Sequence, residues 1–155
     1  MWKDGNSTAV LEVIRKYGEL DNGGKAAVRR VSTPDDLLEL GVFYRLLPDD
    51  AEERSLRQWA RIVFLLPYLG HARGRSIGSV LANGDIREQR IAFITKSDDP
   101  RCFEYLRKAA RRIWNESRED ALVDWTEFAP MLFFWGESRK KDLVRSYYMA
   151  LKKKD

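Results

Sequence analysis

Two clusters of positively charged side chains stand at the spacing of a helix face, an arrangement that can bind phosphate. Lys25 and Arg29 are four residues apart, so a helix places both on one face, and Arg30 follows directly. Guanidinium and ammonium groups form their strongest hydrogen bonds with anionic oxygens, including those of phosphates. Taken alone, this cluster fits an ordinary solvated helix face equally well.

The second cluster lies on the helix that the sequence predicts for residues 100–115. A helical wheel gathers the apolar residues on one side and five cations on the other, with Glu104 as the carboxylate among them. Like charges four residues apart repel by roughly a few tenths of a kcal/mol per pair, so a solvated face normally mixes its signs. We therefore favour an anion bound here over a solvated face. The five cations are Arg101, Arg107, Lys108, Arg111 and Arg112.

The middle of the chain carries all of the net positive charge. Residues 71–112 hold ten Lys and Arg against five Asp and Glu, whereas the formal net charge of the full chain is +4. Such asymmetry favours a polyanionic partner such as nucleic acid. A loop that contains glycines can also meet phosphates through its backbone N–H groups. The remaining candidate cations are Arg73 and Arg75 in a predicted loop, and Arg87 and Arg90 in a predicted helix.

Candidate catalytic residues are scarce. His71 is the single histidine, so a His-rich metal site cannot form, and no nucleophile motif accompanies it. Cys102 falls beside the apolar face of its helix, which favours a packed thiol over a nucleophile. Three aspartate pairs could suggest a metal-dependent nuclease, but each stands at a predicted helix start, where carboxylates cap helices. These pairs are Asp35-Asp36, Asp49-Asp50 and Asp98-Asp99. We expect no catalytic residue, no metal and no cofactor.

Apolar residues recur at helical spacing along almost the whole chain, and no alternating run is long enough to indicate a sheet. We predict an all-α fold, a compact helical bundle of about eight or nine helices, with residues 1–155 forming one domain and a candidate internal seam near 70–75 or 115–120. The expected helices span about residues 7–17, 23–31, 34–40, 51–66, 76–82, 86–96, 100–115, 124–135 and 138–152, with a further turn or two at 43–47.

Several residues are expected to start or stop these helices. Ser7 or Thr8 is a candidate cap for the first helix, and Asp98 or Asp99 for the helix of 100–115. Thr33 precedes a proline and an aspartate in the pattern of a capping box, and Gly41 is expected to end the helix that follows.

The composition also limits where the protein can act. No apolar run approaches the roughly 18 residues of a membrane span, and the N-terminus lacks the apolar core of a secretory signal. Cys102 is the only cysteine, so no internal disulfide can form, which fits a reducing cytoplasm. We expect a cytoplasmic protein with no membrane partner. The helix of 124–135 is apolar on several faces, for which we favour packing in the core, and it is also a candidate contact with another protein subunit.

Several short blocks together resemble the CasB family, the small subunit of the type I-E CRISPR Cascade complex. The blocks include LDNG at 20–23, RRVS at 29–32, FYRL at 43–46 and WG at 135–136. The resemblance extends over nearly the whole chain. It implies an all-α, non-catalytic protein, present in two copies, that joins the backbone subunits of the complex to its large subunit.

The resemblance also implies partners and site residues. Family members are thought to hold the displaced non-target DNA strand and to steady the hybrid of guide RNA and target DNA. The positions that match the family's motifs, and to which this role carries over first, are Arg29, Arg30, Arg90, Arg107 and Lys108. We expect binding to crRNA and target DNA without sequence specificity, together with contacts to other Cascade subunits and to a second copy of the chain. The alternatives are a structural spacer that binds only protein, and a free-standing helical regulator that binds DNA.

Overall fold

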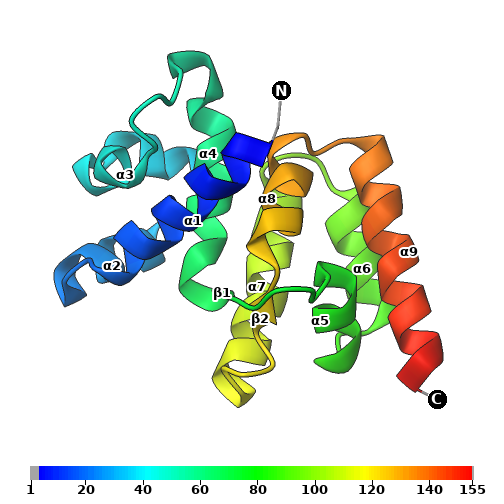
Figure 1. The fold of residues 1–155 in the computed structure, drawn as a ribbon. Coiled ribbons are helices and arrows are strands. Elements are labelled where there is room, and N and C mark those ends of the chain that lie inside the picture. The colour runs from blue at the N-terminus through cyan, green and yellow to red at the C-terminus, as the bar shows by residue number, and fades with distance from the viewer. Residues whose placement is uncertain (1–3, 155) are drawn as a thin grey trace.

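The computed structural model describes residues 4–154, and these form a mostly helical protein (Figure 1). Between Asp4 and Lys154 there are nine α-helices: α1 (Asp4–Gly18), α2 (Asn22–Arg30), α3 (Gly41–Leu46), α4 (Leu56–Leu65), α5 (Ile77–Asn83), α6 (Glu88–Lys96), α7 (Arg101–Glu116), α8 (Trp125–Phe133) and α9 (Glu137–Lys154). Three short 3-10 helices and two short strands complete this range: η1 (Pro34–Glu39), η2 (Glu53–Ser55), η3 (Leu66–Tyr68), β1 (Gly70–His71) and β2 (Leu122–Val123). The all-α prediction is confirmed.

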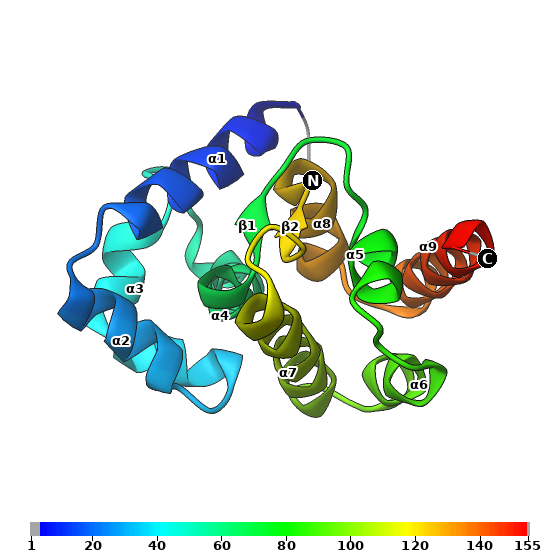
Figure 2. The same cartoon turned by 90° about the horizontal axis from the view of Figure 1, so that it is seen from below.

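Helix α4 is the centre of the fold. It packs against η1, α7 and α8, and six of its ten residues are buried, among them Trp59 and Phe64. In Figures 1 and 2, α1, α2 and α3 form a lobe on the left, while α5, α6 and α9 lie on the right. The largest fully buried side chains include Phe43 of α3, Trp125 of α8 and Tyr147 of α9, and they belong to one core cluster that continues from one side of the molecule to the other.

Local sequence signals explain several helix starts. The Asp21 side chain caps α2 by accepting a hydrogen bond from the Gly24 N–H, 2.7 Å away. Thr33 and Asp36 form the predicted capping box at η1. Asp124, which is only 5% exposed, caps α8 and also accepts a hydrogen bond from the Gly74 N–H. The latter bond connects the loop before α5 to the start of α8.

The two segments suggested as seams lie against each other. Strands β1 and β2 pair in parallel, with Gly70 opposite Leu122 and His71 opposite Val123. This pair was not expected from the sequence, because two residues are too few to show an alternating pattern. The Arg75 guanidinium adds a hydrogen bond of 2.9 Å from Nη1 to the Glu119 carbonyl oxygen. The strand pair and this hydrogen bond therefore hold the segment that follows η3, residues 70–75, against the segment that follows α7, residues 119–123.

Several of the expected helix boundaries are wrong. The first helix already begins at Asp4, before the expected caps Ser7 and Thr8. Gly41 begins α3 instead of ending a helix, because η1 is a tight 3-10 helix that closes at Glu39.

Helix α7 also lacks the expected aspartate cap. Pro100 precedes its first residue, and the Asp99 carboxylate lies 3.4 Å from the Arg61 guanidinium. An ion pair therefore engages this carboxylate in place of the N–H groups of the helix.

Candidate nucleic-acid interface

A groove at the junction of α1, α2, η3 and α7 brings basic residues from distant parts of the chain together. Its volume is about 740 Å³. Four of its lining residues are cations, namely Lys25 and Arg29 of α2, Arg111 of α7, and Arg118 just beyond α7. Three aromatic side chains also line it, namely Tyr17, Tyr68 and Trp114. Among the described residues, no Asp or Glu lines this hollow, which we call the cationic groove.

The helices present these side chains through their ordinary periodicity. In α2, Lys25 and Arg29 share a face, while Val28 is fully buried and fixes the rotation of the helix. In α7, Phe103 and Leu106 are buried against the core, so the opposite side of the helix faces solvent. Figures 1 and 2 both show α2 to the left of α7, and both helices contribute residues to the groove.

The groove cations are not neutralised by neighbouring carboxylates. Within residues 4–154, none of the four forms an ion pair. Two of them lie against aromatic rings instead: the Arg118 Cζ is 4.9 Å from the Trp114 ring centre, and the Arg111 Cζ is 5.9 Å from that of Tyr68. Cation–π contacts orient a guanidinium and leave its full charge in place. The groove therefore keeps a positive potential that attracts anions.

Tyr17 is an aromatic residue of the groove that lies close to one of its cations, Arg29. Burial raises the pKa of the Tyr17 hydroxyl, and Arg29 opposes part of this shift because its charge lies close to the hydroxyl. The side chain is half-buried, so packing holds it in place while part of it lines the groove.

Arg107 occupies a different environment from the other cations of α7. Its Nη1 donates a hydrogen bond of 2.6 Å to the carbonyl oxygen of Val31, and its Cζ lies 4.0 Å from the centre of the Phe64 ring. Burial lowers the pKa of this guanidinium. Arg107 thus joins α7 to the C-terminal end of α2, and the structure assigns it a positioning role between the two walls of the groove.

The other predicted cations lie outside the groove. Arg30, Arg101 and Lys108 are exposed on α2 and α7, and the Arg112 Nε lies 3.9 Å from the Glu116 carboxylate. Arg87 and Arg90 are exposed at the start of α6, which packs against α7. These six residues could extend the cationic surface, and their contact with nucleic acid stays a prediction.

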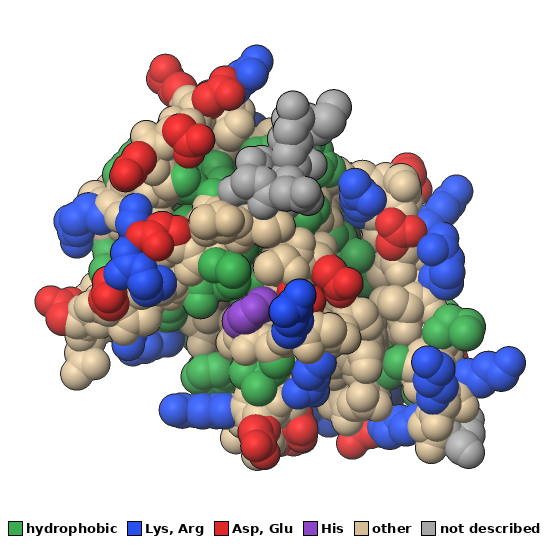
Figure 3. Space-filling view, viewed as in Figure 1, with side chains coloured by type: hydrophobic (Ala, Val, Ile, Leu, Met, Phe, Trp, Pro, Cys, Tyr) green, Lys and Arg blue, Asp and Glu red, His purple; other side chains and the backbone are tan. Residues whose placement is uncertain are grey.

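Gly70 lines the groove, whereas the rest of the loop of 70–75, on the face that carries His71, does not. Arg73 is exposed there, and Arg75 is engaged with the carbonyl of Glu119. Figure 3 shows this face, where His71 (purple) is visible and positive and negative side chains are intermixed. His71 Nδ1 accepts a hydrogen bond of 3.1 Å from the Trp125 N–H, so the histidine supports the start of α8. A mixed surface of this kind attracts a polyanion less than the groove does.

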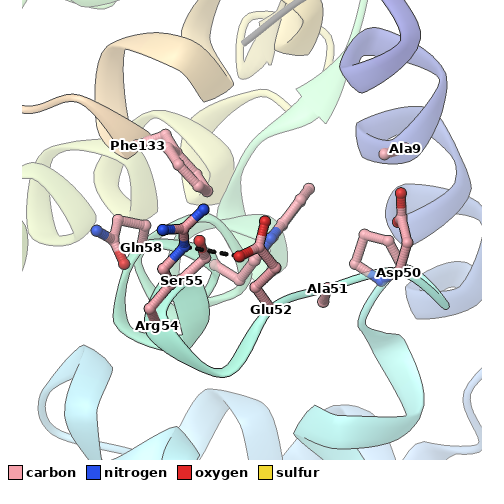
Figure 4. Close-up of a pocket in the computed structure, with 10 residues that line it drawn as sticks. Ala9, Asp50, Ala51, Glu52, Arg54, Ser55, Gln58 and Phe133 are labelled. Atoms are coloured by element: carbon pink, nitrogen blue, oxygen red, sulfur yellow. Dashed lines mark ion pairs between the residues drawn. The ribbon is translucent and has the colours of Figure 1, made fainter. Parts of the chain in front are cut away.

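A second hollow, of about 400 Å³, lies between α1, the segment of 48–55 and Phe133 of α8 (Figure 4). Its lining includes the carboxylates of Asp50 and Glu52, and Arg54 pairs with Glu52 at 2.6 Å. Gln58 Oε1 is buried there without a hydrogen-bond donor in the described part of the chain. With two carboxylates beside one paired arginine, this hollow is poorly suited to an anion.

Several of the residues weighed for catalysis have structural contacts. Asp36 completes the capping box, and Asp35 pairs with Arg57 at 2.6 Å. Cys102 is 1% exposed, and burial raises the pKa of its thiol to about 11, which confirms a packed thiol. Among the described residues, no group of three or more His, Cys, Asp and Glu could hold a metal ion.

No helix in residues 4–154 has the length and apolar character needed to cross a bilayer.

Sequence reasoning missed four residues of the groove: Tyr17, Tyr68, Trp114 and Arg118. Aromatic side chains at helical spacing usually indicate a buried core, so the three aromatic residues did not stand out as candidate site residues. Trp114 and Arg118 are four residues apart, but Arg118 follows the end of α7 and lay in a stretch interpreted as a seam. The turn that follows α7 brings Arg118 over the Trp114 ring, so this contact is local.

The fold and this surface define a small, mostly helical protein with a cationic groove lined by aromatic rings. No protein-family model matches the chain. It is 31% identical over 157 aligned positions to the CRISPR system Cascade subunit CasB of Escherichia coli strain K12, covering 92% of this chain and 94% of that protein. One chain of the crystal structure of E. coli Cascade bound to a PAM-containing double-stranded DNA target is similar with a TM-score of 0.82 and 29% identity, covering 92% of this chain and 96% of that one. The chain belongs to the CasB family, as the sequence blocks predicted.

Proposed function

We propose that this chain is a non-catalytic subunit of a CRISPR Cascade complex and binds the nucleic-acid backbone without reading its sequence. Its nucleic-acid partners are the displaced non-target DNA strand and the hybrid of crRNA and target DNA. Its protein partners are the backbone and large subunits and a second copy of the chain. Membership of the CasB family supports the assembly, as does the structural similarity to a chain of a DNA-bound Cascade.

The observation that carries the binding role is the unneutralised charge of the cationic groove. Lys25, Arg29 and Arg111 come from helices that are far apart in sequence, yet they line one hollow without a carboxylate partner in the described residues. Grouping cations in this way costs repulsive free energy, which a bound phosphate chain offsets. Contacts of this kind bind any sequence, because the backbone is the same at every position.

Such binding matters because opening a DNA duplex by a guide RNA is close to energetic balance. The hybrid that forms is about as stable as the duplex that it replaces, so small contributions decide the outcome. A subunit that holds the released strand by its phosphates shifts this balance toward the open state at every target sequence. Arginine suits the task, since its planar fork can bond two phosphate oxygens at once.

The test uses the assembled complex with the double variant Lys25→Glu/Arg111→Glu. Size-exclusion chromatography measures assembly, and permanganate reactivity of unpaired thymines measures opening of the target duplex. We expect normal assembly with opening weakened by about tenfold or more, because two phosphate contacts become repulsive. The matched control is Arg139→Glu/Lys141→Glu on α9, which changes the net charge equally, and neither residue lines the groove.

The two alternative functions predict different results. A protein-only spacer would open the target normally in both double variants, which would overturn the binding role and leave the assembly role. A free-standing regulator would give a consensus sequence when selected against random duplexes. We expect no consensus, because the groove supplies backbone contacts.

A further inference from the structure

We propose that the cationic groove takes one unpaired nucleotide, with its base stacked on the aromatic and guanidinium surfaces and its phosphate bound by the surrounding cations. The inference rests on the proposed function and adds to it the class of ligand, since backbone binding alone needs no contact with a base. It predicts that the groove distinguishes an unpaired nucleotide from a bare phosphate chain and from a base-paired duplex.

The aromatic lining is the first observation that points to a base. Tyr17, Tyr68 and Trp114 come from α1, η3 and α7, and their side chains line the same hollow. All three residues are half-buried, so packing fixes their rings while part of each reaches the groove. A surface that bound only phosphates would need cations alone. Aromatic rings beside cations are the usual means by which proteins bind single-stranded nucleic acid.

The geometry of the arginines is the second observation. The Arg118 guanidinium lies over the Trp114 ring, with Cζ 4.9 Å from the ring centre. The flat face of a guanidinium can itself stack against a nucleobase, as an aromatic ring does. A base can therefore continue the Trp114–Arg118 stack, while the N–H groups at the edge of the guanidinium remain free for a phosphate. Arg111 beside Tyr68, at 5.9 Å, offers a second contact of the same type.

The size and charge of the groove fit this ligand. A volume of about 740 Å³ lies within the range of small-ligand sites, so it exceeds what a single phosphate requires. The lining combines aromatic surface with four cations, and a nucleotide combines a flat aromatic base with an anion. A base within a duplex is already stacked and paired, and reaching the groove would require it to be extruded. The groove therefore favours an unpaired nucleotide, either within a strand or free in solution.

The experiment compares two single strands with the same number of phosphates, using the purified full-length chain. One probe is oligothymidylate, and the other is an oligonucleotide of the same length in which every nucleotide is abasic. Fluorescence anisotropy gives both affinities. We expect oligothymidylate to bind about 5-fold to 150-fold tighter, which is the effect of one stacked base. Duplex DNA of equal phosphate number serves as a third probe and should bind more weakly than oligothymidylate.

Two variants locate the effect. Trp114→Leu should abolish most of the difference between the two strands, and Trp114→Phe should restore it, because phenylalanine keeps an aromatic face. Tyr148→Leu is the control, since Tyr148 is an exposed aromatic residue (44% exposed) on α9 and does not line the groove. A further measurement uses the unmodified chain and so avoids any folding defect of a variant. The fluorescent base 2-aminopurine, placed in the strand, should lose fluorescence on binding because stacking quenches it.

The outcomes separate this inference from the proposed function. Equal, salt-dependent affinities for the two strands, together with unquenched 2-aminopurine, would overturn the base contact and leave backbone binding intact. Failure of both strands to bind would overturn both proposals. Competition by thymidine monophosphate, but not by inorganic phosphate, would support the inference and show that a free nucleotide is sufficient. A base-dependent affinity without such competition would support it for nucleotides within a strand.

Discussion

The Arg107 guanidinium donates a hydrogen bond of 2.6 Å to the carbonyl oxygen of Val31, a residue 76 positions earlier in the sequence. Val31 follows the last residue of α2, where helix carbonyls lack partners within the helix. The same guanidinium lies over the Phe64 ring of α4 at 4.0 Å. One side chain therefore connects three helices and sets the spacing between the two walls of the cationic groove.

Replacing Arg107 with methionine should lower the free energy of unfolding by about 1–3 kcal/mol, because the variant loses a charge-assisted hydrogen bond and a cation–π contact. Urea unfolding followed by circular dichroism measures this loss. The matched control is Lys108→Met, which removes an exposed cation of the same helix and should change stability by less than about 0.5 kcal/mol. Equal effects of the two substitutions would contradict the positioning role of Arg107.

The buried carboxylate of Asp124 should make stability depend on acid pH. Burial raises its pKa, but hydrogen bonds from the Thr126 hydroxyl, the Gly74 N–H and the Thr126 N–H outweigh burial and hold the pKa below its ordinary value. The unfolded chain therefore takes up this proton at a higher pH than the folded chain does. The stabilisation is complete above about pH 4 and is lost as the pH falls further.

Asp124→Asn should accordingly lower stability at pH 7 by about 1–2 kcal/mol, because asparagine has one acceptor oxygen fewer for these donors, and should flatten the decline below about pH 4. Unfolding curves between about pH 2.5 and pH 7 provide the measurement. Glu127→Gln, an exposed position in the same helix, is the control and should keep the profile of the unmodified chain. Parallel profiles for the Asp124 variant and the unmodified chain would show that this carboxylate is not the source of the dependence.

Gly78 allows α5 and α9 to approach closely. A Cβ atom at this position would lie 1.8 Å from Ser146 Oγ and 2.4 Å from the Tyr147 backbone nitrogen. Gly78→Ala should therefore cost about 3 kcal/mol or more, because backbone atoms of α9 must move. Gly18→Ala is the matched control, since no atom lies within 4 Å of its Cβ position, and should stabilise α1 by about 0.5 kcal/mol. Similar melting temperatures for the two variants would contradict the close packing.

Much of the fold could be predicted because its signals are local. The periodicity of residues 100–115 correctly placed Phe103, Leu106 and Ala110 in the core, and the capping box at Thr33 formed as expected. The two short strands could not be predicted, since each consists of two residues and depends on a partner about 50 positions away.

The site was predictable only in part. The helical wheel placed Arg107 with the solvent-facing cations, at the edge of their arc and about 20° from Trp114. A residue at that boundary can turn toward solvent or toward the core, and its actual partners, Val31 and Phe64, are distant in sequence. The convergence of Lys25 with Arg111 is likewise a property of the tertiary fold.

The most direct test of the central claim is the salt dependence of binding between the purified full-length chain and random single-stranded DNA. With four groove cations engaged, the logarithm of the association constant should fall with the logarithm of salt concentration at a slope of about −3. Lys25→Glu/Arg111→Glu should flatten this slope, and Arg139→Glu/Lys141→Glu should leave it unchanged. Binding by the unmodified chain that does not weaken between about 50 mM and 300 mM salt would contradict the account.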